Sequence, residues 1–199
     1  MISAFNIKLD QQVLPRLVAI GRFDGVKPTL ALGTTGGKVL LHSPHENYQA
    51  RGNAYAGSSD YNNDTNVRHL NFNRKITALT TGSFQGNTVG SSSSGAGGAT
   101  PDILFIGTET SLLAYDVERN ADLFFKDVSD GVNCLLVGKE GTASQPIVLA
   151  GGNCSVLGFD DKGEEALWTV TGDNASSIAL CDVDNDGHLE MVVGSDDFE

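Results

Sequence analysis

The chain has 199 residues, of which 25 are acidic and 13 are basic, so its formal net charge is −12 at pH 7. This charge argues against nucleic acid and anionic membrane surfaces as partners, because a phosphate backbone is held by a stripe of Lys and Arg that the sequence lacks. Charged residues make up 19% of the chain, Gly is frequent, and apolar residues occur in short β-branched runs bounded by turn residues. This composition is typical of an all-β protein.

The amino terminus does not resemble a targeting segment. Residues 1–9 contain too few apolar side chains for a signal peptide and alternate as a strand does. No segment reaches the roughly 20 apolar residues of a membrane span. Cys134, Cys154 and Cys181 each lie in an apolar run, and an odd number of cysteines suits a reducing compartment. We therefore expect a cytosolic chain with buried free thiols and no direct membrane insertion.

The first repeat unit is predicted to run from the amino terminus to His42. Its core is an apolar strand that turns at Asp24-Gly25, a second strand at 29–33, a Gly-rich turn at 35–37 and a further strand at 38–42. The polar residues 45–73 that follow have neither a helical nor a strand period. We expect them to form a long surface insert.

The second unit begins at Lys75 and contains a second predicted insert, residues 83–100. This insert includes a low-complexity run of Ser, Gly and Ala at 91–98, which cannot bury apolar area. Because it separates two strands of one unit, it can loop out without disturbing the sheet. The unit then resumes at Asp102.

Residues 112–125 could form a helix or a hairpin, since their apolar residues recur near helical spacing. The corresponding segment of the third unit, residues 154–170, has a clear turn at Asp161-Lys162-Gly163 and therefore favours a hairpin in both units. Trp168, on the last strand of the third unit, is expected to pack between neighbouring units.

Four strands per unit, recurring at about 45 residues once the inserts are discounted, is the period of β-propeller blades. The sequence thus predicts an all-β chain, residues 1–199, that forms the amino-terminal part of a β-propeller domain with four-stranded antiparallel blades. Three blades and the start of a fourth cannot close a ring, so we expect a fragment of a longer protein. The open edge of its last sheet would invite pairing with another copy.

The start of the fourth unit, Cys181–Gly194, contains the side chains of a cation-binding loop. Asp182, Asp184 and Asp186 occupy positions 1, 3 and 5 of such a loop, and Gly187 at position 6 permits a sharp turn. His188 at position 7 would bind through its backbone carbonyl. Glu190, at position 9, is the last candidate ligand.

This loop differs from a helix-flanked calcium loop. Position 12 is Val193 instead of Glu, and both flanks have the pattern of strands. We predict a structural cation, Ca²⁺, that joins the first two strands of the fourth blade. The alternative is an acidic surface turn whose Asp and Gly residues serve hairpin geometry alone. The earlier units carry Arg, Phe, Ser, Gln or Lys at these positions, so the repeat itself is structural.

The sequence offers no convincing catalytic constellation. His42 and His45 are separated by Pro44 and have no third zinc ligand nearby. Residues 33–38 have the wrong spacing for a phosphate-binding loop. We therefore predict that the chain is not an enzyme and has no catalytic or cofactor-binding residues apart from the candidate cation loop.

Blocks along nearly the whole chain resemble the amino-terminal propeller of the Bardet–Biedl syndrome protein 2 family. The blocks are Pro15–Gly25, Leu112–Val117, Asp122–Phe124, Asp130–Asn133, Gly151–Cys154, Leu167–Asn174 and Ala179–Asp182. Residues 45–73 and 83–100 lie outside the resemblance.

The resemblance implies a subunit of the BBSome, a complex that carries membrane proteins into and out of cilia. It implies a scaffold without catalysis, whose partners are other BBSome subunits and especially a related propeller subunit. It also implies a location in the cytoplasm, the cilium, the ciliary membrane and the basal body.

Two other classes remain as alternatives. An extracellular calcium-dependent adhesion propeller of the integrin-α type would need a signal peptide, paired cysteines and acidic loops in several blades. A quinoprotein-like propeller enzyme would need polar residues that face a cofactor.

Overall fold

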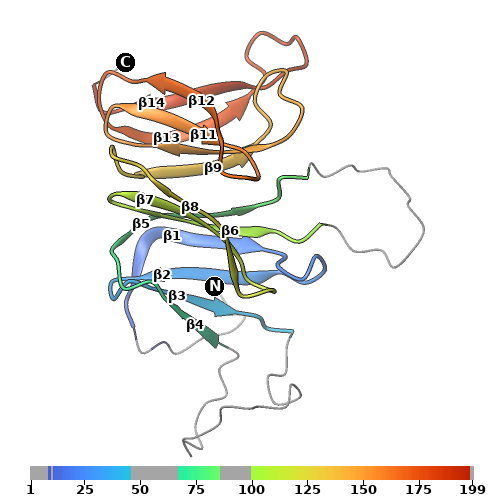
Figure 1. Ribbon diagram of the computed structural model, residues 1–199, viewed down its shortest axis with the longest axis vertical. Helices are drawn as coiled ribbons and strands as arrows, with labels where there is room; N and C mark the ends of the chain where they lie inside the picture. The colour runs from blue at the N-terminus through green and yellow to red at the C-terminus, as the bar shows by residue number, and fades with distance from the viewer. Residues whose placement is uncertain (1–8, 10, 46–66, 86–99, 198–199) are drawn as a thin grey trace, which may run out of the picture.

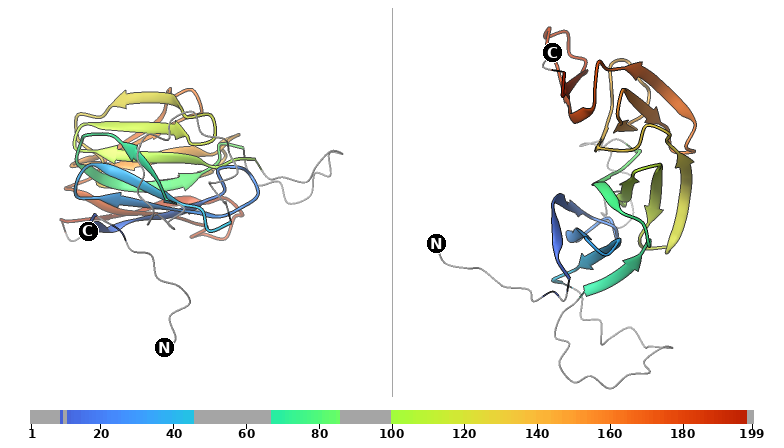
Figure 2. Two further views of the ribbon diagram at one scale, coloured as in Figure 1. Left: turned by 90° about the horizontal axis from the view of Figure 1, so that it is seen from below. Right: turned by 90° about the vertical axis from the view of Figure 1, so that its left-hand side faces the viewer.

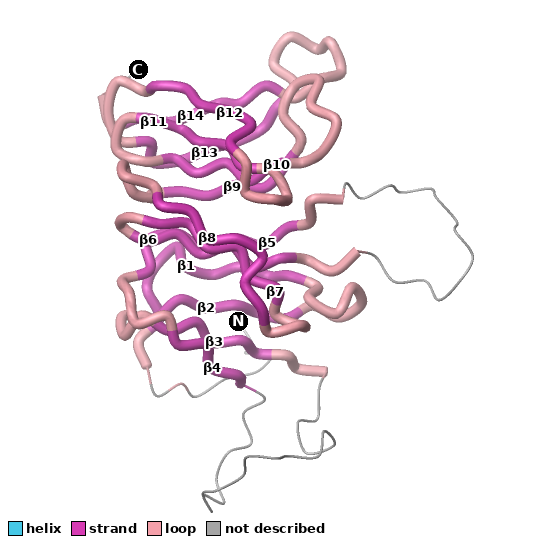
Figure 3. The backbone as a smooth tube through the Cα atoms, in the orientation of Figure 1, coloured by secondary structure: helices cyan, strands magenta, loops and turns pink. Residues whose placement is uncertain are grey.

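The structure is a computed structural model that describes residue 9 and residues 11–45, 67–85 and 100–197. Every regular element in this part of the chain is a β-strand (Figure 3). No helix among these residues has the length and apolar character needed to cross a membrane.

The strands form three four-stranded sheets and one two-stranded sheet, each an antiparallel meander in chain order (Figure 1). Blade 1 contains β1 (Val13–Gly21), β2 (Thr29–Thr34), β3 (Lys38–His42) and β4 (Val67–Asn71). Blade 2 contains β5 (Ile76–Gly82), β6 (Ile103–Thr108), β7 (Ser111–Asp116) and β8 (Ala121–Asp127). Blade 3 contains β9 (Cys134–Gly138), β10 (Ile147–Gly151), β11 (Ser155–Phe159) and β12 (Glu165–Val170). The fourth sheet contains β13 (Ala175–Cys181) and β14 (Glu190–Ser195).

The sheets follow one another along an arc, as the right-hand view in Figure 2 shows. The first strand of each sheet lies beside the first strand of the next, so that β1 contacts β5, β5 contacts β9 and β9 contacts β13. This is the arrangement of propeller blades, whose first strands line the central axis. The predicted fold class is confirmed: three four-stranded antiparallel blades and the first two strands of a fourth.

Apolar side chains fill each space between neighbouring blades. The cluster between blades 1 and 2 includes Val39, Leu41, Ile76 and Leu104, all at most 1% exposed. The second cluster, between blades 2 and 3, is centred on Phe105, Leu112 and Val148. A smaller third cluster joins blade 3 to the fourth sheet through Leu149, Val156 and Ala175. Because successive side chains of a strand point to opposite faces, a central strand contributes to both neighbouring clusters, as Leu104 and Phe105 of β6 do.

The predicted hairpin at 112–125 is confirmed as β7 and β8, which pair across the turn at residues 117–120. The predicted strand at residues 1–9 falls on residues outside the described part, apart from Leu9, which is not in a strand. The first described strand, β1, begins at Val13.

The predicted insert at 45–73 is too long, because β4 occupies Val67–Asn71 and pairs along β3 with partners such as Val39↔Leu70. As the outer strand of blade 1, β4 has no fully buried residue. Its sequence therefore lacks the apolar alternation by which a strand is recognised. Residues 46–66 lie outside the described part.

The second predicted insert, 83–100, also includes a core residue. Phe84 is 7% exposed and its ring meets the ring of Phe105 edge-on, with centroids 5.4 Å apart. Residues 86–99 lie outside the described part.

Two expectations about burial are wrong. Trp168 is 62% exposed, because it lies on the outer strand of blade 3. Cys154 and Cys181 are exposed, and only Cys134 is partly buried; all three are free thiols. Cys154 and Cys181 lie at a turn and at a strand end, where an apolar neighbourhood in sequence does not produce burial.

Candidate metal centre

The candidate cation loop connects β13 to β14, as predicted. The two strands pair from Ala175↔Ser195 to Cys181↔Glu190, so residues 182–189 form the loop. Two loop residues have left-handed backbone conformations, Asn185 with φ 63° and Gly187 with φ 89°. Asn and Gly adopt this conformation at the lowest cost, which allows the chain to coil back on itself here.

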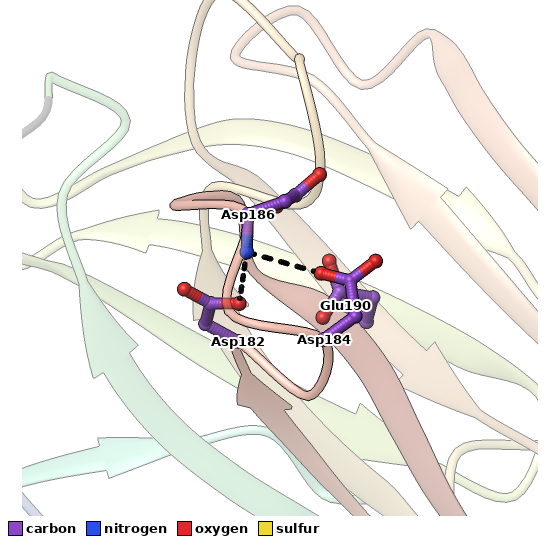
Figure 4. Close-up of side chains that lie close together, drawn as sticks. All are labelled: Asp182, Asp184, Asp186 and Glu190. Carbon is purple, nitrogen blue, oxygen red and sulfur yellow. Dashed lines mark hydrogen bonds between the residues drawn. The ribbon is translucent and has the colours of Figure 1, made fainter.

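Four of the five predicted ligand residues come together. Asp182, Asp184, Asp186 and Glu190 each offer a carboxylate oxygen, and these oxygens all lie within 4.8 Å of one another. Figure 4 shows Asp182, Asp184 and Asp186 around one coil of the loop, with Glu190 entering from the start of β14. Asp184 and Asp186 are exposed, whereas Asp182 and Glu190 are partly buried.

Backbone N–H groups hold these carboxylates in place. The Asp186 N–H donates to Asp182 Oδ1 at 3.1 Å and to Asp184 Oδ1 at 3.2 Å (Figure 4). The Gly187 N–H donates to Asp182 Oδ2 at 3.0 Å, and the Val183 N–H donates to Glu190 Oε2 at 2.7 Å. A carboxylate has about four lone-pair positions, so each can still accept a further contact.

This spacing fits a calcium ion. Ca²⁺ binds oxygens at about 2.3–2.6 Å, so two ligands on opposite sides of the ion are about 5 Å apart. The ring of His188 does not belong to the cluster, whereas the backbone N–H of His188 donates to Asp186 Oδ1 at 2.8 Å. Ligation through the His188 carbonyl stays a prediction.

The loop is also tied to blade 3. The Gly141 N–H, in the β9–β10 connection, donates to the Leu189 carbonyl at 2.7 Å. The role of Leu189 cannot be predicted from the sequence, because a contact between the loops of neighbouring blades leaves no signal in local spacing. Through this hydrogen bond, the geometry of the acidic loop is coupled to the end of blade 3.

The corresponding turn of blade 1 is held without a cluster of acids. Asp24 Oδ1 accepts the N–H groups of Val26 and Lys27 at 2.8 and 2.7 Å. Burial acts to raise the pKa of Asp24, but these backbone donors outweigh it and the pKa lies below its ordinary value. The turn of blade 1 therefore supports the prediction that the repeat itself is structural.

Together, these observations define a class of protein: a β-propeller built from antiparallel blades, with one acidic hairpin loop. Two solved structures share the fold. The crystal structure of Saccharomyces cerevisiae Sqt1 superposes with a TM-score of 0.55 at 15% identity, over 84% of this chain and 38% of that chain. A crystal structure of BBS1N in complex with ARL6DN, soaked with lead, gives a TM-score of 0.50 at 14% identity, over 84% and 45% of the two chains.

The chain belongs to the family described as ciliary BBSome complex subunit 2, N-terminal, whose model matches residues 19–138. It is 42% identical over its whole length to the BBSome complex member BBS2 of Danio rerio and to that of Homo sapiens. A match to the Caenorhabditis elegans BBSome complex member bbs-2 is 48% identical over 49% of the chain. The chain spans 26% of the length of the vertebrate relatives. The predicted family resemblance is confirmed.

Proposed function

We propose that the chain is a scaffold propeller of a BBSome subunit, which supplies protein contacts and no catalysis. The observation that carries this proposal is the family match over residues 19–138, which covers blades 1 and 2 from within β1 and continues through β9. Propeller blades expose the loops at both ends and the outer strands, so they offer several separate surfaces to partners.

The proposed partners are other BBSome subunits, in particular a related propeller subunit. The proposed role is in ciliary membrane-protein trafficking and cilium assembly, in the cytoplasm, at the basal body, in the cilium and at the ciliary membrane. The relatives bear the description of BBSome complex members, which supports this assignment. An extracellular adhesion propeller of the integrin-α type is not favoured, because the family match and the relatives belong to the BBSome.

Depletion and re-expression in ciliated cells tests this role. Cells that lack the full-length protein should accumulate or lose membrane proteins in their cilia, and re-expression should restore the normal composition. A full-length protein that lacks residues 1–199 should fail to do so. Normal ciliary composition in the depleted cells would contradict the proposed role.

We also propose that the acidic loop binds Ca²⁺ as a structural ion between β13 and β14. Four carboxylates within 4.8 Å of one another support this proposal, since their mutual repulsion would be relieved by a divalent cation. The ion would hold the hairpin without switching it.

Thermal unfolding with and without calcium tests the site. An ion that binds only the folded state stabilises it by about 2.7 kcal/mol at one hundred times its Kd. Ca²⁺ should therefore raise the melting temperature of the wild type. Asp184→Asn should abolish this rise, because it removes one negative charge from the ligand set. The Asn side chain keeps an oxygen that can accept the Asp186 N–H, so the loop itself should stay intact. Asp122→Asn, on β8, serves as the matched control and should retain it. An unchanged melting temperature of the wild type at millimolar Ca²⁺ would refute the site.

A further inference from the structure

A groove lies between the outer parts of blades 2 and 3, away from the acidic loop. Its volume is about 380 Å³. One wall is formed by residues 127–130, at the end of β8 and in the turn that follows. The other wall is formed by β11 and β12 through Ser155, Leu157, Glu165 and Trp168.

Trp168 presents a large apolar side chain in this groove and does not pack in any of the cores between the blades. It is the single Trp of the chain and is 62% exposed. Its strand partner is Leu157, which packs onto the core between blades 2 and 3. Val170, two residues further along the same strand, is also 62% exposed. Tryptophan is among the side chains that most often dominate the binding energy of protein interfaces.

The polar lining of the groove is acidic. Asp127, Asp130 and Glu165 contribute three carboxylates, and no Lys or Arg lines the groove. Lys126 precedes Asp127, but its side chain lies near Gly163 in the β11–β12 turn and is not part of the lining. Within the described part of the chain, none of the three carboxylates forms an ion pair.

The walls of the groove are held by contacts between the blades. Ser155 Oγ donates to Asp130 Oδ2 at 2.6 Å, and the Asn153 N–H donates to the Asp130 carbonyl at 2.9 Å. The Gly131 N–H closes the turn on the Val128 carbonyl at 3.0 Å. Asp130 is therefore fixed, which leaves Asp127 and Glu165 as exposed carboxylates on opposite walls.

We propose that this groove binds an arginine-bearing segment of a partner protein, with the guanidinium stacked on Trp168 and paired with Glu165 or Asp127. The planar guanidinium stacks on aromatic faces and pairs with carboxylates through two parallel hydrogen bonds, which suits a site that combines the two. The acidic lining complements a basic occupant and repels an acidic one. The inference rests on the proposed role in protein contact, but the groove lies on different residues from the acidic loop.

Peptide binding to the intact chain tests this inference. The probe is a short fluorescein-labelled peptide of alternating Arg and Gly, and binding is followed by its anisotropy. Unlabelled peptide should change the emission of Trp168, the only Trp present. Two control peptides carry other residues in place of Arg: Lys keeps the positive charge without the planar group, and citrulline keeps the planar shape without the charge. The Arg peptide should bind most tightly and the citrulline peptide least.

Variants of exposed residues should leave the fold intact and locate the binding. Trp168→Ala and Glu165→Gln should each weaken binding by about fivefold or more. Asp122→Asn removes one charge from the other end of β8 and should change binding less than about twofold. Equal weakening by Asp122→Asn, unchanged binding by Trp168→Ala, or equal binding of the citrulline peptide would each overturn the proposal. Recovery of BBSome subunits is a separate measurement, so failure of the groove and failure of the scaffold role can be told apart.

Discussion

Glycines at the ends of the inner strands allow neighbouring blades to approach closely. Gly21, Gly82 and Gly138 each end the first strand of a blade, and each faces a side chain of the next inner strand. A Cβ on Gly21 would lie 3.1 Å from Thr81, one on Gly82 would lie 2.7 Å from the Cβ of Val137, and one on Gly138 would collide with Leu180. The recurring apolar run that ends in Gly is therefore a packing signature.

Gly82→Ala should lower the free energy of unfolding by about 1–3 kcal/mol, because the added methyl group overpacks the contact with Val137. Gly36→Ala is the matched control, since its Cβ would meet nothing closer than 3.4 Å. Chemical denaturation followed by circular dichroism gives both values. Equal stability of the two variants would contradict the packing role of Gly82.

The thiols should differ in reactivity. Burial raises the pKa of Cys134 to about 11, although the Gly151 backbone lowers it slightly. At mildly alkaline pH, iodoacetamide should therefore label the exposed Cys154 and Cys181 before Cys134, as mass spectrometry can show.

The raised pKa of Cys134 also makes the stability of the fold depend on pH. Because the folded-state pKa lies above the unfolded one, the stability linked to Cys134 is complete below pH 9 and is lost as the pH rises towards about 11. In the iodoacetamide experiment, labelling of Cys134 before the other two thiols would contradict its burial.

At the scale of elements, the inserts differ from what local sequence suggests. The start of the second insert, Ser83 to Gln85, is part of blade 2, since Phe84 packs in its core. Ser83 Oγ donates to Thr100 Oγ1 at 3.1 Å, so the chain returns close to its point of departure. A buried Phe within a polar, Gly-rich stretch could have been recognised by its apolar character alone.

A short Gly-Ser linker in place of residues 86–99 should leave the melting temperature almost unchanged, because Ser83 and Thr100, on either side of this segment, are already in hydrogen-bond contact. Phe84→Ala, just outside the replaced segment, should cost about 3–5 kcal/mol. Thermal unfolding of both variants checks where blade 2 ends and the insert begins. A large loss of stability on replacement, or none in Phe84→Ala, would place the boundary elsewhere.

For the molecule as a whole, the repeat of strands and Gly turns was sufficient to predict the propeller and its blade order. It could not locate β4, because this outer strand buries no complete side chain, as the exposed His69 and Asn71 illustrate. The spacing of Asp182, Asp184, Asp186 and Glu190 predicted which acids converge, since ligands of one loop are local in sequence. The groove beside Trp168 joins two blades, and its walls are 25 or more residues apart in the chain.

Affinity capture of the full-length protein from extracts of ciliated cells tests the scaffold role directly. We expect the other BBSome subunits to be recovered with the wild type, and a related propeller subunit among them. Gly82→Ala should recover less of them in proportion to its loss of folded protein, whereas Gly36→Ala should match the wild type. Capture of folded wild-type protein without any BBSome subunit would contradict the scaffold role.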